Sequence, residues 1–119
     1  MRIVEQRNNH DCGICCIAML CDVSYEASHK IAKKFKSLQE QRFEKLPDMF
    51  AQFGFDSQIY NEMPTKPKYN GLIEVTQLYE GEEVFHYISY DAEKGQILNP
   101  WLSAPKEFNK LRFLEVKKH

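Results

Sequence analysis

The sequence predicts an α+β fold of two layers, in which an N-terminal helical half packs on a C-terminal antiparallel β-sheet. Up to Gly54 the chain carries helical patterns and helix boundary signals, and after it come short apolar or alternating segments separated by turns. Because helices come first and strands follow, the two kinds of element segregate into separate layers. With 119 residues the chain has material for one core, so we expect residues 1–119 to form a single domain.

Three helices are predicted in the first half. The central helix runs from about Cys12 to Asp22 and is apolar on every side, which is typical of a buried helix. Ser24 fits the N-cap of a second helix that continues to about Phe35. A short third helix is expected to begin near Pro47 and to stop at Gly54.

Five strands are predicted in the second half. Turn-rich segments separate them, and the third strand is apolar or aromatic on both faces, so we expect it to be central in the sheet. Short connections between successive strands favour an antiparallel meander. The predicted strands are Phe55–Tyr60, Gly71–Leu78, Val84–Tyr90, Gln96–Leu98 and about Leu111–Val116.

Composition excludes several functional classes. The net charge is -1 and no large block of one sign occurs, so no electrostatic footprint for nucleic acid is present. No apolar run approaches the roughly 20 residues that span a bilayer. The N-terminus lacks the apolar core of a signal peptide, so we expect a cytoplasmic protein. All four cysteines fall in one short segment, where bridges are geometrically poor, and no disulfide framework is expected.

Cys12 is the candidate nucleophile. It stands where the polar loop Asn8–Asp11 meets the buried helix, at the helix end that favours an anion. Thiols in such positions have a lowered pKa and raised reactivity. We therefore expect a reactive thiol at Cys12.

A nucleophilic thiol needs a base, and the base needs a group that orients it. Of the four histidines, His86 lies inside an apolar strand, where a polar imidazole is unusual and indicates a functional role. The hairpin to Gln96–Leu98 delivers Asn99 beside that strand, and its side-chain oxygen is the expected acceptor for the imidazole N–H. The backbone N–H of Cys12 and the amide of Gln6 are the expected oxyanion donors. Gly13 has no side chain, so we expect a substrate backbone to approach there.

These residues resemble a known family. Gln6, Cys12-Gly13, His86-Tyr87-Ile88 and Asn99-Pro100, in this order, resemble the C39 family of papain-like cysteine peptidases. The resemblance implies a papain-like fold with Cys12 as nucleophile, His86 as base, Asn99 as orienting residue and Gln6 as oxyanion donor. It implies no metal or cofactor, and a peptide or protein as substrate. The family usually has aspartate at the position of Asn99, and orientation needs an acceptor but not a charge.

Many members of the family precede a peptide-exporting transporter and cleave leader peptides after a double glycine. We expect this chain to be a stand-alone C39-like domain, and the double-glycine substrate is not carried over. Two alternatives remain. One is a papain-like acyltransferase or deamidase, because a triad does not determine which molecule accepts the acyl group. The other is an inactive domain that binds peptides. The sequence indicates neither the cleavage preference nor the oligomeric state.

Other interpretations of single residues stay open. Cys12 and Cys15 have the spacing of a thiol-disulfide oxidoreductase, and with Cys16 they offer three thiols to zinc. Cys15, Cys16 and Cys21 are most simply small core residues. Trp101 is expected to pack in the core, with a place in the substrate cleft as the alternative.

Overall fold

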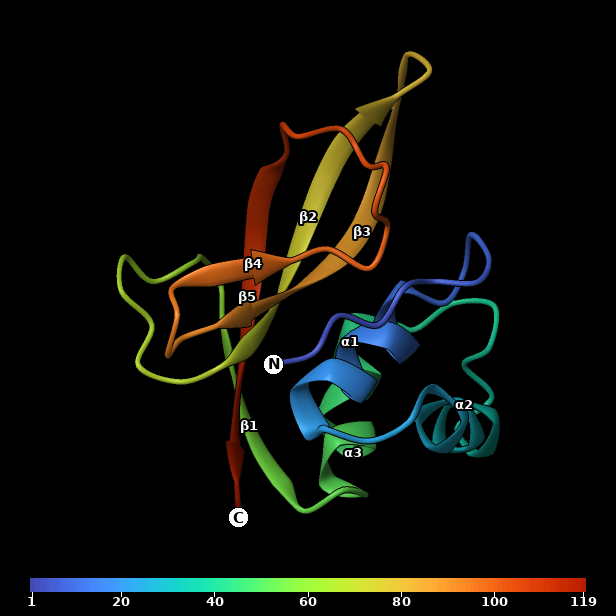
Figure 1. Ribbon diagram of the computed structural model, residues 1–119, viewed down its shortest axis with the longest axis vertical. Helices are drawn as coiled ribbons and strands as arrows, with labels where there is room; N and C mark the ends of the chain where they lie inside the picture. The colour runs from blue at the N-terminus through green and yellow to red at the C-terminus, as the bar shows by residue number, and fades with distance from the viewer.

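The computed structural model describes all 119 residues and has the two expected layers, with the helices gathered against one part of a twisted sheet (Figure 1). Helices occupy the N-terminal half and strands the C-terminal half, which confirms the predicted α+β class. The elements are α1 (Cys12–Cys21), α2 (Tyr25–Lys34), the 3-10 turn η1 (Phe43–Lys45), α3 (Leu46–Ala51), β1 (Phe55–Tyr60), β2 (Gly71–Tyr79), β3 (Glu82–Asp91), β4 (Gln96–Leu98) and β5 (Asn109–Lys118).

Local sequence signals set the helix boundaries. The Ser24 hydroxyl accepts a hydrogen bond from the N–H of Ala27 at 3.0 Å, which caps α2 as predicted. Pro47 lies in the first turn of α3, where its missing N–H costs nothing. Gly54 has a φ of +81°, the left-handed conformation that ends a helical segment, and β1 follows directly.

The strand order is β1-β5-β2-β3-β4, and every neighbouring pair is antiparallel. The expectation of a simple meander was wrong in one respect, because the last strand returns and inserts between β1 and β2. This insertion gives β1 its only strand partner, β5. Strand insertion depends on pairing across more than 50 residues, and local turn signals do not report it.

β3 is not central along its whole length, contrary to the prediction. It pairs with β2 throughout, but β4 has only three residues and covers only Ser89–Asp91. From Glu82 to Ile88 one side of β3 is therefore a free edge. The N-terminal end of α1 lies beside this edge (Figure 1). The backbone N–H of Tyr87 in β3 is therefore close to the Cys12 thiol.

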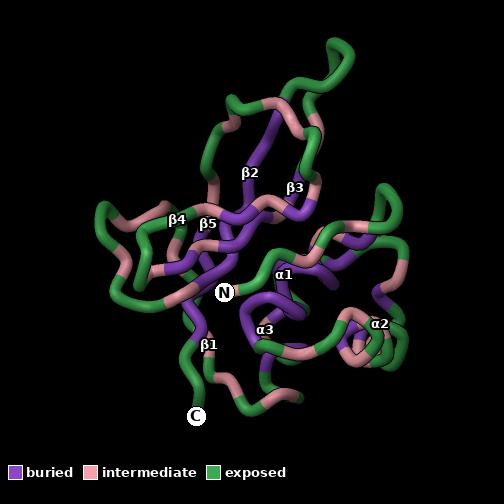
Figure 2. The backbone as a smooth tube through the Cα atoms, in the orientation of Figure 1, coloured by how far each residue is buried: buried purple, intermediate pink, exposed green.

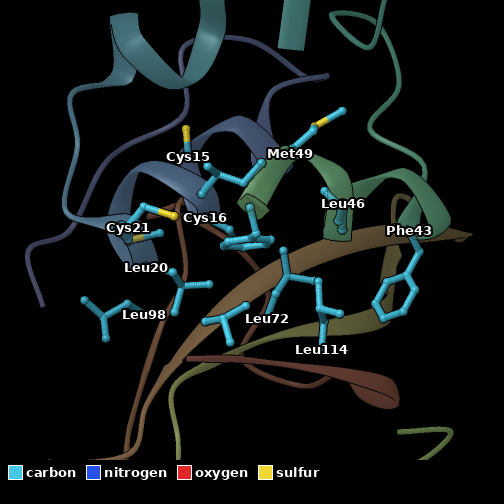
Figure 3. Close-up of a cluster of buried hydrophobic side chains, with 14 residues drawn as sticks. Cys15, Cys16, Leu20, Cys21, Phe43, Leu46, Met49, Leu72, Leu98 and Leu114 are labelled. Carbon is cyan, nitrogen blue, oxygen red and sulfur yellow. The ribbon is translucent and has the colours of Figure 1, made fainter. Parts of the chain in front are cut away.

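The main core lies between the helices and one face of the sheet. Figure 3 shows Leu72 of β2 and Leu114 of β5 facing the side chains of α1 and α3. Cys15, Cys16 and Cys21 are free thiols buried in this core, which confirms them as small core residues. A second, smaller cluster covers the opposite face of the sheet around Ile73, Val75, Ile88 and Phe113.

The β2–β3 hairpin extends beyond the helices, and its tip is exposed (Figure 2). Glu80 and Gly81 form a two-residue turn with φ values of +51° and +81°, the conformation that matches the twist of the two strands. Leu78 and Phe85 are each 70% exposed on this hairpin. None of the helices is both long and apolar enough to cross a membrane.

Candidate active site

His86 and Asn99 meet as the hairpin predicts. The Nε2 atom of His86 lies 2.7 Å from Oδ1 of Asn99. That oxygen also accepts the backbone N–H of Trp101 at 3.0 Å, which fixes the orientation of the Asn99 amide. Because Oδ1 can only accept, Nε2 of His86 must carry the proton and Nδ1 is free to take one. This is the tautomer that a general base needs.

Cys12 and His86 line the same cleft. The cleft has a volume of about 410 Å³ and lies between the N-terminal end of α1, the loop before η1 and the free edge of β3. Cys12 is the first residue of α1, so its N–H has no partner inside the helix. No hydrogen bond joins Cys12 to His86, and the imidazole bonds only to Asn99. Catalytic hydrogen bonds often form only when substrate binds.

The electrostatics of Cys12 differ from the expectation. Burial raises the pKa of the Cys12 thiol to about 11, although the backbone N–H groups of Tyr87 and Gly13 favour the thiolate. The predicted lowering of this pKa was wrong because the sequence shows the helix terminus but not the chain segments that desolvate it. Burial also lowers the pKa of His86 below its usual 6.5, and the hydrogen bond that His86 donates to Asn99 opposes this only in part. Both groups are therefore neutral at pH 7.

Asp11 organises the loop that leads to Cys12, a role that the sequence did not indicate. Its buried carboxylate accepts the backbone N–H groups of Arg7 at 2.9 Å and Asn8 at 3.4 Å, and the hydroxyl of Tyr25 at 2.8 Å. Three donors hold the loop against α2. An acidic residue at a helix N-terminus was the available signal, but its partners lie both before and after it in the chain.

Gly13 is required by a neighbour that the sequence did not reveal. A Cβ atom at Gly13 would stand 2.7 Å from Cβ of Gln41, so the close approach there is made by Gln41 and not by substrate as expected. The buried Gln41 side chain accepts the N–H of Gly13 at 3.2 Å, and its backbone carbonyl accepts the hydroxyl of Tyr87 at 2.6 Å. Gln41 thus ties the start of α1 to β3.

Gln6 lies near Asn99 but does not line the cleft. Its backbone N–H donates to the carbonyl of Pro100 at 2.9 Å, which places it one residue from Asn99. The side-chain NH2 donates to the carbonyl of Asn8 at 2.9 Å, and Oε1 is buried without a hydrogen-bond partner. The NH2 group that was expected to hold the oxyanion therefore donates to the carbonyl of Asn8.

Trp101 is not a core residue, contrary to the expectation. Its half-exposed ring lies edge-on to the ring of His86, with centroids 5.9 Å apart. On its other side it contacts Tyr79, with centroids 5.1 Å apart. The ring of Trp101 therefore packs against both His86 and Tyr79, beside the Asn99 side chain that accepts its backbone N–H.

The far wall of the cleft carries an ion-pair cluster. Arg112 donates from Nε and Nη2 to the two carboxylate oxygens of Glu74, at 2.7 and 2.8 Å, and from Nη1 to Glu44 at 3.3 Å. The guanidinium also stacks 4.1 Å above the ring of Phe43. The two-pronged contact fixes the side chain, so this end of the cleft is polar and pre-formed. Spacing in sequence gave no signal for it.

The remaining ligand-type residues do not gather into a second site. His10 is exposed at the cleft, His29 stacks on Tyr25, and His119 pairs with Asp56 at 2.9 Å. No three side chains of the histidine, cysteine, aspartate or glutamate types come together in a metal-binding arrangement.

The sequence profile of the Peptidase C39 family matches residues 1–112. No curated protein and no solved structure matches the chain.

Proposed function

Because the chain belongs to the peptidase C39 family, we propose that it is a cysteine peptidase that hydrolyses a peptide bond through Cys12, His86 and Asn99. The observation that carries this proposal is the 2.7 Å contact between Nε2 of His86 and Oδ1 of Asn99, made at the rim of the cleft that holds the Cys12 thiol. The contact selects the tautomer in which Nδ1 is the base.

The reaction begins from a neutral thiol and a neutral imidazole. When substrate fills the cleft, Nδ1 of His86 takes the proton of Cys12 as Sγ attacks the carbonyl carbon. His86 then gives this proton to the departing amine, and a thioester remains on Cys12. Water attacks the thioester with His86 again as base, which releases the acid and restores the thiol.

The oxyanion is held by the free N–H of Cys12 and by the side chain of Gln6. The Gln6 Oε1 atom is buried without a hydrogen-bond partner, so a half-turn of the amide breaks no hydrogen bond at that end. The half-turn places the NH2 there, and its bond to Asn8 is exchanged for one to the oxyanion.

The test is a peptide library of mixed sequence, digested by the protein and read by mass spectrometry for new termini. Cleavage that is lost in Cys12→Ala and in His86→Ala supports the proposal. Both variants must show the far-ultraviolet circular dichroism of the parent, so that loss of fold is excluded. Cleavage that survives in Cys12→Ala, or none by the parent protein, overturns it.

One observation favours a second function. The pKa of Cys12 near 11, without a hydrogen bond to His86, is what an unreactive thiol would show in a domain that binds peptides without cleaving them. The same library separates the two, because peptides retained intact by both the parent and Cys12→Ala indicate binding without cleavage.

A further inference from the structure

Tyr25, the first residue of α2, is tied to the loop before Cys12 by both its hydroxyl and its ring. The hydroxyl donates to Oδ2 of Asp11 at 2.8 Å. The guanidinium of Arg7 stacks on the ring, with its Cζ 3.8 Å from the ring centroid. The same guanidinium pairs with Glu26, the next residue of α2, at 3.0 Å. The start of α2 therefore holds this loop through three separate contacts.

Asp11 connects the Tyr25 hydroxyl to the backbone of the loop. Oδ2, which accepts that hydroxyl, also accepts the backbone N–H of Arg7 at 2.9 Å. The other carboxylate oxygen accepts the N–H of Asn8 at 3.4 Å. Asp11 is only 1% exposed, and a buried carboxylate that loses a donor is costly to keep in place. Removal of the Tyr25 hydroxyl should therefore loosen the carboxylate and the backbone that it holds.

Gln6 lies where the backbone is held on both sides. Its own N–H donates to the carbonyl of Pro100 at 2.9 Å, and the next N–H, that of Arg7, donates to Asp11. The side chain has a single hydrogen bond, from its NH2 to the carbonyl of Asn8, and Oε1 has no partner. The backbone at Gln6 is therefore fixed while its amide can turn. A donor that must meet a developing charge needs this combination.

We infer that Tyr25 is a positioning residue for the proposed reaction. Its hydroxyl, acting through Asp11, holds the backbone at Gln6 so that the Gln6 amide can reach the oxyanion. The inference rests on the proposed function. Tyr25 does not line the cleft, so its effect on the chemistry passes through the loop. Such effects can be large, because a donor misplaced by about 1 Å can cost about a hundredfold in rate.

A double-mutant cycle on Tyr25 and Gln6 tests the inference, with kcat and KM measured on a peptide that the protein cleaves. Tyr25→Phe removes the hydroxyl and keeps the ring on which Arg7 stacks. We expect kcat to fall about tenfold with little change in KM, because the loosened donor acts only in the transition state. In the Gln6→Ala background, Tyr25→Phe should lower kcat no further, since the donor that it positions is already absent.

Two controls separate positioning from a general loss of structure. Alkylation of Cys12 by iodoacetamide passes through no oxyanion, so its rate should be the same in Tyr25→Phe and in the parent protein. Tyr69→Phe is the matched variant, because Tyr69 also has a cation over its ring, with Nζ of Lys117 4.1 Å from the centroid, but does not line the cleft. Tyr69→Phe should leave kcat unchanged.

Each outcome has a distinct meaning. An unchanged kcat in Tyr25→Phe, or an equal loss with and without the Gln6 side chain, overturns the inference and leaves the peptidase proposal intact. A loss of kcat that is matched by slower alkylation of Cys12 also overturns it, because damage to the start of α1 would explain both. An unchanged kcat in Gln6→Ala overturns it as well. If the parent protein cleaves no peptide, the proposed function fails and this inference fails with it.

Discussion

Replacing Asn99 by aspartate should convert the neutral resting site into one that favours a charged imidazole. The carboxylate would take the place of an oxygen that lies 2.7 Å from Nε2 of His86. For charge centres about 4 Å apart at an effective dielectric constant of about 20, the attraction is about 4 kcal/mol, and solvent at the cleft reduces it. This attraction acts against the burial effect that lowers the pKa of His86. We therefore expect the pKa of His86 to move from below 6.5 to above it in Asn99→Asp.

A higher pKa of His86 in Asn99→Asp has a consequence for the thiol of Cys12. A His86 that is charged at pH 7 stabilises the thiolate of Cys12, whose pKa burial raises to about 11 in the parent protein. Alkylation of Cys12 by iodoacetamide at pH 7 should therefore be faster in Asn99→Asp than in the parent. The other three cysteines are buried, so mass spectrometry of the native protein assigns the reaction to Cys12.

Nuclear magnetic resonance titration of the His86 ring measures its pKa directly, and Asn99→Ala is the matched control that removes the acceptor without adding charge. In that control the pKa of His86 should fall further, since the hydrogen bond that His86 donates to Asn99 raises it. If Asn99→Asp and Asn99→Ala move the pKa in the same direction, or alkylation at pH 7 is unchanged in Asn99→Asp, the electrostatic reasoning for this site is wrong.

Three further predictions test other contacts. Gln6→Ala should lower kcat by about a hundredfold, because one oxyanion donor is lost, and an unchanged kcat on a cleaved peptide would exclude that role. Phe85→Ala should raise KM severalfold, since Phe85 lines the cleft, whereas Leu78→Ala, with equal exposure outside it, should not; equal effects on KM would contradict the assignment. Gly13→Ala should lower the free energy of unfolding, measured in urea, by about 1–3 kcal/mol, because the new methyl group meets Gln41. An unchanged urea midpoint of unfolding would show that the start of α1 shifts to accept the methyl group without cost.

Features that depend on neighbours in sequence were predicted well. The cap at Ser24 and the stop at Gly54 are set by groups within a few residues. The contact of His86 with Asn99 was also predictable, because a short hairpin fixes the register of the two strands that carry them. In each case the physical cause lies within about one hairpin of the residue concerned.

Features set by distant segments were missed or mistaken. The raised pKa of Cys12 arises from burial beneath chain segments far from the helix start, and Tyr87 contributes a backbone N–H from 75 residues away. Gln41 reaches Gly13 from a loop that the sequence marks only as polar. Trp101 was expected in the core because its size favours burial, but the short β4 leaves it beside an open edge of β3.

The insertion of β5 between β1 and β2 has a consequence for how the chain acquires its fold. A ribosome delivers residues in order, so β1 waits without any strand partner until the last strand has emerged. Pairing Phe55 with Lys118 closes a loop of more than 60 residues, and such long-range closure slows folding. The helices and the β2–β3 hairpin can form early, but the sheet beneath them becomes continuous only once β5 has left the ribosome. We therefore expect the proposed peptide-cleaving activity to arise all at once after β5 has emerged, and not gradually as the earlier elements appear.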